Sequence, residues 1–248
     1  IKEGSQSVGG NTVDVIFVDS IKTKFYKNSI NSTPIEINID GELTLSSYEN
    51  KQGITKDNLR KVVIGFNVRT ISSQAFRGCR KLQSVTIPNS VTSIGSYAFH
   101  YCTELPSVTI PDSVTSIGQY AFSRCENLQS VTIPDSVTRI GKLAFQNCNQ
   151  LQSVTIGNSV MSIGDYAFRD CYVLPSLNIP DSVGTIASDA FEKSGILTLY
   201  MTENNGLGIK EKGKRLVGRT NKNIRVNVIF VDSFNTKFYI DDINSTPI

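Results

Sequence analysis

The sequence predicts a β-rich solenoid of six 23-residue coils, with small β elements at both ends. The first observation is the spacing of the cysteines, since all five lie 23 residues apart along the 248-residue chain. The second is that the residue types around each cysteine keep the same period. A repeat of about 20 to 50 residues is typical of solenoids, in which each coil packs only on its neighbours. The cysteines are Cys79, Cys102, Cys125, Cys148 and Cys171.

Each coil is expected to begin with a strand. In the coil that starts at Leu82, Val85 and Ile87 alternate with hydroxyl side chains, the period-two pattern of a strand with one buried face. Pro88 ends this strand because proline lacks the backbone N–H that a ladder needs, and Asn89 favours a turn. We therefore expect these strands to stack in parallel, with the chain turning a corner after each one.

The second half of the coil is expected to be a short extended segment and a turn. Val91 and Ile94 point inward from the segment, which ends at Gly95 because glycine suits a tight backbone position. The Tyr-Ala-Phe sequence that follows predicts a single helical or 3₁₀ turn that buries the phenylalanine. The core is then built around one column of rings, formed by Phe76, Phe99, Phe122, Phe145, Phe168 and Phe191.

The coil pattern divides the chain into four parts. Coils start at Leu59, Leu82, Leu105, Leu128, Leu151 and Leu174, and half a coil follows up to residue 201. We expect a β-rich flank and cap over residues 1–58, the solenoid over 59–201, a basic connector over 202–225, and a duplicated flank element over 226–248.

The full coil pattern, Leu-x-x-Val-x-Ile-Pro-x-Ser-Val-x-x-Ile-Gly-x-x-Ala-Phe-x-x-Cys, resembles the BspA-like (Treponema-type) leucine-rich repeat. The resemblance covers residues 59 to about 200. It implies a right-handed leucine-rich repeat solenoid with a parallel sheet on one side. It also implies binding to other macromolecules, as in the surface adhesins of bacteria and some parasitic protists, and it supplies no catalytic residues.

The flanks contain a second repeat. Residues 13–35 recur as residues 226–248 with 17 of 23 positions identical. In the first copy Val13, Val15 and Phe17 alternate as in a strand, and residues 23 to 26 form a second short β-like run. We expect either tandem units of about 213 residues or a strand that pairs between neighbouring copies. The candidate self-association residues are Val228, Phe230, Phe238 and Tyr239.

A short stretch between flank and solenoid is expected to cap the first coil. It spans residues 37–45, and Asp40-Gly41 within it is a hairpin signal.

Composition and motifs favour a binding protein over an enzyme. The net charge is only +3, so non-specific attraction to nucleic acid is not expected to dominate. The apolar runs are far shorter than the ~20 residues that span a bilayer, so no membrane insertion is expected. No phosphate-binding loop or nucleophile motif is present, and no cofactor is expected. The cysteines are expected to pack as small buried thiols, because five cannot all pair and zinc ligands cluster differently. The single histidine, His100, is expected at the surface.

Partner contacts are expected at positions that the core leaves free. The residues around each cysteine vary from coil to coil and form a mixed polar and aromatic edge, suited to a protein or glycan. Tyr97, Tyr120 and Tyr166 form a further partial column for which core packing is equally reasonable. The candidate partner-binding residues are Arg77, Arg80, Lys81, His100, Tyr101, Glu104, Arg124, Glu126, Arg169 and Tyr172.

Three further surfaces have weaker claims. A basic stretch could bind an anionic partner, although a solvated turn that joins the solenoid to the flank explains it better. The row of Asp and Asn at the coil corners could hold calcium, but turn capping accounts for both residue types. The outward Ser-x-Thr array could bind ice or crystal surfaces, yet threonine is also a good strand residue. The residues of the basic stretch are Lys210, Lys212, Lys214, Arg215 and Arg219.

The sequence therefore predicts a non-enzymatic binding module that acts outside the cell or at its surface. No signal peptide is present in this numbering. The alternative is a structural module that assembles end to end into a fibre or sheath.

Overall fold

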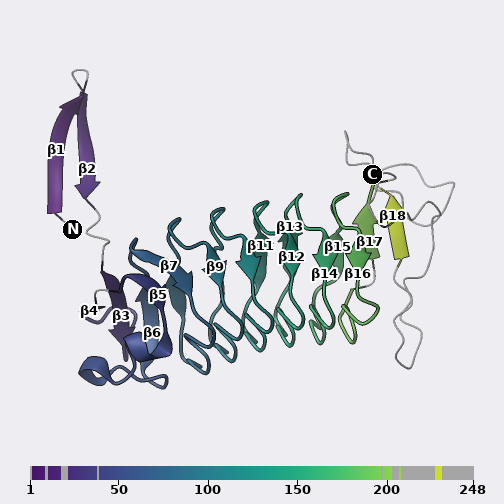
Figure 1. Ribbon diagram of the computed structural model, residues 1–248, viewed down its shortest axis with the longest axis horizontal. Coiled ribbons are helices and arrows are strands. Elements are labelled where there is room, and N and C mark those ends of the chain that lie inside the picture. The colour runs from purple at the N-terminus through teal and green to yellow at the C-terminus, as the bar shows by residue number, and fades with distance from the viewer. Residues whose placement is uncertain are drawn as a thin grey trace.

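The computed structural model is a β-solenoid whose coils stack along one axis (Figure 1). It describes residues 2–8, 11–17, 22–37, 39–196, 198–202, 207 and 227–230. The solenoid predicted from the 23-residue period is confirmed. Its longest sheet has seven parallel strands, of which six come from the second extended segment of each coil rather than the first, and one, β5, comes from the N-terminal flank. The strands are β5 (Gly41–Leu43), β7 (Val68–Ile71), β9 (Ser93–Ile94), β10 (Ser116–Ile117), β12 (Arg139–Ile140), β14 (Ser162–Ile163) and β16 (Thr185–Ile186).

The strands of the first segment also run parallel, but they form separate short sheets. Ladder bonds join successive coils here, as when Gln129 N donates to the carbonyl of Pro106. Pro106 and Pro175 occupy the same coil position and have no N–H to donate, so pairing stops before each of them. The first-segment strands are β6 (Leu59–Val63), β8 (Ser84–Thr86), β11 (Ser130–Ile133), β13 (Ser153–Ile156), β15 (Ser176–Asn178) and β17 (Thr198–Met201).

This ladder gives a first prediction. Replacing Gln129 by proline removes the bond from its N–H to Pro106 and is expected to lower the free energy of unfolding by about 1–3 kcal/mol. Chemical denaturation measures the loss. The matched control is Gln129→Ala, which keeps the N–H and trims only an exposed side chain, so its cost is expected to be below about 0.5 kcal/mol. Equal losses in the two variants would show that the ladder bond is not what matters there.

The turn side of the coil differs from the expected helical turn, because no helix forms in the described part of the solenoid. The backbone N–H groups of Tyr97, Phe99 and Tyr101 donate instead to carbonyls of the next coil, at 3.0, 2.8 and 3.0 Å. Tyr97 and Tyr101 adopt left-handed backbone conformations, with φ of 59° and 64°. Donors used between coils cannot also close helical bonds within one.

The glycine column lies at a tight backbone position, as expected, and the tightness comes from the neighbouring coil. Gly118 does not have a positive φ. Its role is close approach, because a Cβ atom there would overlap the backbone of Ser96 in the preceding coil. A larger residue at Gly118 would therefore force the two coils apart.

The phenylalanine column forms the centre of the core. Neighbouring rings stack with centroids 5.2–6.0 Å apart, from Phe76 to Phe191. At the N-terminal end the column continues into the flank through Tyr48, 5.4 Å from Phe76, and then Phe25, 4.9 Å from Tyr48. Both flank rings are fully buried. The same stack thus ties the cap to the coils.

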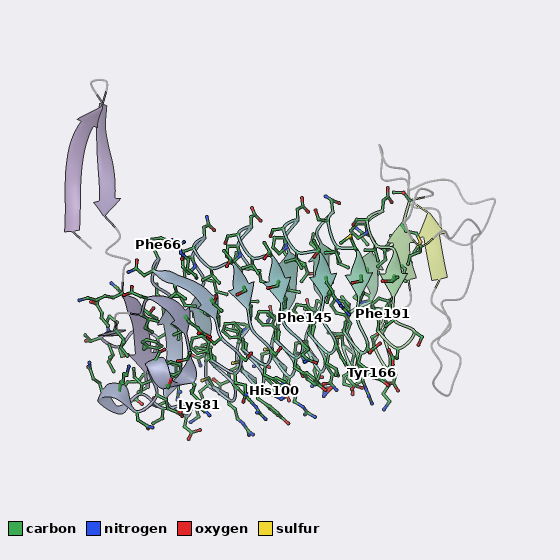
Figure 2. The ribbon with its side chains drawn as sticks, viewed as in Figure 1. Phe66, Lys81, His100, Phe145, Tyr166 and Phe191 are labelled. Carbon is green, nitrogen blue, oxygen red and sulfur yellow. The ribbon has the colours of Figure 1, made fainter. Side chains whose placement is uncertain are left out.

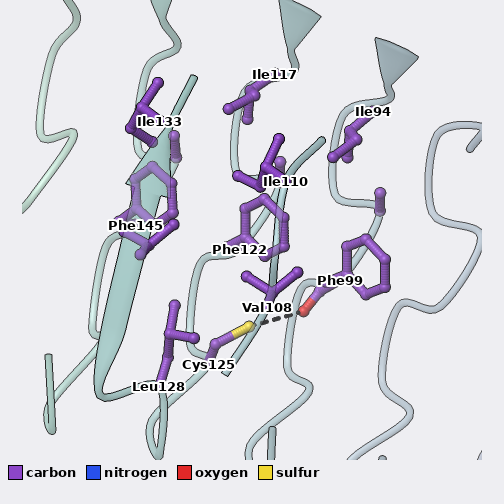
Figure 3. Close-up of a cluster of buried hydrophobic side chains, with 14 of the residues drawn as sticks. Ile94, Phe99, Val108, Ile110, Ile117, Phe122, Cys125, Leu128, Ile133 and Phe145 are labelled. Carbon is purple, nitrogen blue, oxygen red and sulfur yellow. Dashed lines mark hydrogen bonds between the residues drawn. The ribbon is translucent and has the colours of Figure 1, made fainter. Parts of the chain in front are cut away.

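The cysteines lie beside this column as buried free thiols, which confirms the expected packing role. Four of them also donate a hydrogen bond across the coils. Cys125 Sγ, for example, lies 3.2 Å from the carbonyl oxygen of Phe99 (Figure 3). Burial raises the pKa of every one of these thiols, to about 11 for Cys79 and about 12 for Cys171.

The N-terminal flank caps the solenoid by strand pairing. Strand β3 (Thr23–Lys27) pairs antiparallel with β4 (Ile35–Ile37) and with β6 of the first coil. The hairpin predicted at Asp40-Gly41 does not form, since β5 runs parallel to β7 and so adds a strand to the long sheet. Two 3₁₀ turns follow, η1 (Leu45–Ser47) and η2 (Lys51–Gly53), and Thr44 caps the first. Strands β1 (Lys2–Val8) and β2 (Asn11–Phe17) form an antiparallel hairpin that projects beyond this end (Figure 1).

At the other end, strand β18 (Asn227–Phe230) pairs in parallel with β17. The first part of the duplicated flank element therefore extends the sheet of the last coil. Phe238 and Tyr239, and the basic residues between 210 and 219, lie outside the described residues.

Candidate partner-binding surface

The sequence-predicted partner residues come from the turn side of the coils. Figure 2 shows Lys81, His100 and Tyr166 along this edge, with Phe145 and Phe191 inside the solenoid. The contacts divide the predicted residues into two clusters. One is centred on Tyr101 and the other on Arg169.

The first cluster has two arginines over one tyrosine ring. The guanidinium carbon of Arg80 lies 5.5 Å from the centroid of Tyr101, and that of Arg124 lies 5.0 Å from it. Such cation–π contacts contribute about 0.5–1 kcal/mol each at exposed sites. Arg80 is exposed, whereas Tyr101 and Arg124 are half-buried. The tyrosine therefore holds two cations of different coils close together.

A pair of stacked tyrosines lies next to this group. The rings of Tyr97 and Tyr120 stack at 4.5 Å with an interplanar angle of 9°, and Arg77 lies over Tyr97 at 5.6 Å. Both rings are half-buried, so they serve packing and surface at once. From the sequence, a role in packing and a role at the surface are equally reasonable for these tyrosines. The signal that predicts their contact is the 23-residue spacing, because equivalent residues in successive coils lie about 4.8 Å apart.

His100 is buried, which corrects the expectation of a surface position. Its exposed fraction is 8%, and its Nδ1 lies 3.1 Å from the carbonyl oxygen of Ser123. Its ring packs edge-on against Tyr97 and Tyr101, at 5.4 and 4.4 Å. Burial lowers the pKa of His100, and the charges of Arg77 and Arg124 lower it further. The imidazole is thus neutral at pH 7 and supports the aromatic residues rather than meeting a partner.

The other predicted residues of this region lie at the rim of the same cluster. Lys81 is exposed and adds positive charge, while Glu104 is half-buried and accepts a hydrogen bond from Gln83 Nε2 at 3.0 Å. Glu126 is also half-buried. We call Arg77, Arg80, Tyr97, Tyr101, Tyr120 and Arg124 the Arg–Tyr patch.

The second cluster is electrically compensated. The Nε atom of Arg169 lies 3.3 Å from a carboxylate oxygen of Asp170 and 3.3 Å from one of Glu192, and its guanidinium lies over Tyr166. Tyr172 is 58% exposed and donates a hydrogen bond to Asp170. Because two carboxylates face one arginine, this cluster lacks the excess positive charge of the Arg–Tyr patch.

A groove of about 1140 Å³ lies along the coil corners, over β11, β13, β15 and β17. It contains exposed Thr132 and Thr155, which belong to the Ser-x-Thr array. Within this array only β11 and β13, from two successive coils, pair as strands. The Ser-x-Thr side chains therefore do not lie on one continuous sheet of the kind that binding to an ice or crystal surface would use. Asp135 Oδ1 accepts a hydrogen bond from Asn158 N at 2.6 Å, so this corner aspartate bonds the next coil.

The residues that the structure describes lack two features of other protein classes. There, no three His, Cys, Asp or Glu side chains gather in a way that could bind a metal ion. Within the same residues, no helix has the length and apolarity that a bilayer crossing requires.

Comparison with known proteins was made at the level of sequence and of structure. A family model described as the BspA-type leucine-rich repeat region matches residues 50–149 and 92–208, with six copies. The number of copies equals the number of coils counted from the sequence. No curated protein matches the chain.

Several solved structures are similar to the chain. A leucine-rich repeat protein from Bacteroides ovatus is 23% identical over 77% of this chain and 60% of its own, with a TM-score of 0.51. A leucine-rich cell surface protein from Faecalibacterium prausnitzii is 25% identical (60% and 55% covered, TM-score 0.41), and a T. pallidum leucine-rich repeat protein is 28% identical (58% and 59%, TM-score 0.39). The chain thus spans less than two thirds of each. The first of these likenesses supports the fold alone.

Proposed function

Since the chain belongs to the BspA-type leucine-rich repeat family, we propose that it is a non-enzymatic binding module whose Arg–Tyr patch recognises a partner outside the cell or at its surface. The observation that carries the proposal is the placement of Arg80 and Arg124 over the ring of Tyr101. The stacked coils supply a rigid scaffold, and the residues that vary between coils supply the specificity.

The chemistry of the patch matches that of protein interfaces. Arginine and tyrosine are enriched among the few residues that carry most of the binding energy, and they gather in partly desolvated positions. Here the ring of Tyr101 and the packing around His100 fix the side chains before a partner arrives. Prior fixation reduces the entropy that would be lost on binding.

The charge of the patch favours an acidic protein surface as the partner. Arg77, Arg80 and Arg124 meet no carboxylate within salt-bridge distance among the described residues. Arginine binds carboxylates through two parallel hydrogen bonds, which gives geometric selectivity as well as attraction. An acidic glycan shares the carboxylate chemistry and is the other outcome of a binding screen.

The test starts with a screen of immobilised extracellular proteins and glycans, followed by affinity measurement on variants. Tyr101→Ala removes the platform under both arginines and is expected to weaken binding by about 30-fold or more. Arg139→Ala is the control, since it removes one exposed positive charge on β12, away from the patch, and is expected to change affinity less than about twofold. Thermal unfolding of both variants checks that the coils remain folded. Equal affinity for Tyr101→Ala and the unmodified protein would place the binding surface elsewhere.

A further inference from the structure

Two nearly identical four-residue segments of this chain form different strand pairings. Residues 14–17 (DVIF) lie in β2 and pair antiparallel with β1. Residues 227–230 (NVIF) form β18 and pair in parallel with β17. The two segments differ only at their first residue, and they begin the two copies of the duplicated flank element. The sequence is therefore compatible with both partners.

The parallel pairing places the segment in register with the coils. Val228 lies opposite Leu199, and Phe230 lies opposite Met201. Leu199 and Met201 are buried, and they continue the inward columns that Val154 and Ile156 form in an earlier coil. The Val-x-Phe of the segment thus takes the place of the apolar pair that every full coil carries, which is Val-x-Ile in the first five coils and Leu-x-Ile in the sixth. In sequence terms, residues 227–230 imitate one more coil strand.

The end of a solenoid needs such a strand. Without β18, the outer edge of β17 would expose a row of backbone N–H and C=O groups, and solenoids require caps because an open edge pairs with other chains. Added strands bind through main-chain hydrogen bonds, with selectivity from alternate side chains. Residues 15 and 17 are Val and Phe, as are residues 228 and 230, so the first copy meets the same requirements.

We propose that residues 14–17 of one copy of the chain add to β17 of a second copy, in the place of residues 227–230, and so join the solenoids head to tail. The partner is a second copy of this chain. The contact is independent of the Arg–Tyr patch and goes beyond the proposed binding function. It assigns a role to the flank repeat, which the coil repeat leaves unexplained.

Strand β3, which follows residues 14–17 in the first copy of the flank element, keeps the two joined solenoids close together. Strand β3 caps the first coil of its own solenoid through pairing with β6. Six residue steps separate Phe17 from Thr23, which an extended chain spans in at most roughly 20 Å. A strand donated to the last coil of one copy would therefore hold the first coil of the donor within that distance. The two solenoids would lie nearly end on end.

Competition within the chain decides when the joint forms. In an isolated copy, residues 227–230 pair with the edge of β17. Because this segment is tethered to the same chain, its effective concentration at that edge is on the order of millimolar. The donor segment must also leave β1, and a two-stranded hairpin is only marginally stable by itself. We therefore expect the unmodified chain to be mainly monomeric at micromolar concentration.

The first experiment removes β18 from the edge of β17 in the full chain. The double variant Val228→Asp with Phe230→Asp disfavours the pairing of β18 with β17. Analytical ultracentrifugation is then expected to show dimers and longer oligomers, whose fraction rises with protein concentration. Adding Val15→Asp and Phe17→Asp removes the donor and is expected to restore the monomer. A vacated chain that stays monomeric at high micromolar concentration overturns the proposal. So does a fourfold variant that assembles as well as the twofold one.

The second experiment leaves every docking strand in place. Ile229 lies opposite Tyr200, and Ile16 is its equivalent in the first copy. Copies carrying Ile16→Cys, mixed with copies carrying Tyr200→Cys, are expected to form a disulfide-linked pair under mild oxidation. Copies carrying Asn178→Cys are the control, because this exposed position belongs to β15, whose edge β17 already covers. Absence of the Ile16–Tyr200 link at high concentration, or an equal yield with the control, contradicts the proposal.

Discussion

Raising the pH from 7 to about 10 is expected to lower the free energy of unfolding by several kcal/mol, because unfolding then releases thiol protons that the folded protein retains. The ordinary thiol pKa is near 9, and burial raises it to about 11 for Cys79 and about 12 for Cys171, with the other three also raised. At pH 10 each thiol that ionises only on unfolding costs about 1 kcal/mol. Domains are commonly stable by about 5–15 kcal/mol, so the effect is large.

The sign follows from where the protons are held. A buried thiol keeps its proton in the folded protein to a higher pH than in the unfolded chain. The stabilisation is fully present below pH 9 and is lost as the pH rises from there toward the folded-state pKa of each thiol. Chemical denaturation at a series of pH values, with absorbance of thiolate as a second signal, measures the slope.

A single substitution separates this effect from other alkaline damage. Cys125→Ala removes one titrating thiol and also the donor to the Phe99 carbonyl. The variant is expected to be less stable at pH 7 than the unmodified protein. Between pH 9.5 and 11, however, its free energy of unfolding is expected to fall less steeply, with a slope smaller by about 1.4 kcal/mol per pH unit. An unchanged slope would mean that thiol ionisation does not drive alkaline unfolding.

Truncating Phe122 to alanine is expected to cost about 3–5 kcal/mol of unfolding free energy. Its ring is fully buried between Phe99, at 5.2 Å, and Phe145, at 5.5 Å, with interplanar angles of 4° on both sides. The mutation leaves a cavity between two coils that cannot close, because backbone hydrogen bonds fix the spacing of the coils. Equilibrium denaturation measures the loss.

The matched control is the same truncation at the end of the column. Phe191 is only partly buried and stacks on one side, with its centroid 6.0 Å from that of Phe168. Phe191→Ala is therefore expected to cost clearly less, about 1–2 kcal/mol. Similar losses at Phe122 and Phe191 would show that position along the column does not matter, as expected if each coil unfolded alone.

The binding surface depends on the same stack of coils. The Arg–Tyr patch combines side chains of successive coils, and no single coil contains both arginines and the ring of Tyr101 that lies between them. The side chains at the variable positions therefore form one continuous surface only after the coils have stacked. On the function proposed above, we therefore expect a partner to recognise the folded module and not its repeat sequence.

The candidate site could be predicted in part from the sequence. The free positions around each cysteine predict an edge of variable residues, and in the structure Arg80 and Arg124 of that edge lie over the same ring of Tyr101. The free positions could not separate this group from the compensated one at Arg169, because its partner Glu192 comes from the next coil. They also placed His100 at the surface, although its neighbours Tyr97 and Tyr120 cover it.

The period, the inward columns and the limits of the coils can be predicted from the amino-acid sequence, because a side chain that must be buried in every coil repeats at a fixed spacing. How neighbouring coils meet depends on contacts between residues far apart in the chain. Pro106 and Pro175 interrupt the sheets of the first coil segment, because the backbone N–H that proline lacks would donate to another coil. Left-handed turns replace the expected helical turns, because the N–H groups of the left-handed residues donate to the next coil. Residues 14–17 and 227–230 show the same limit most clearly. Nearly identical segments pair differently because a strand's partner is chosen by the edge within its reach.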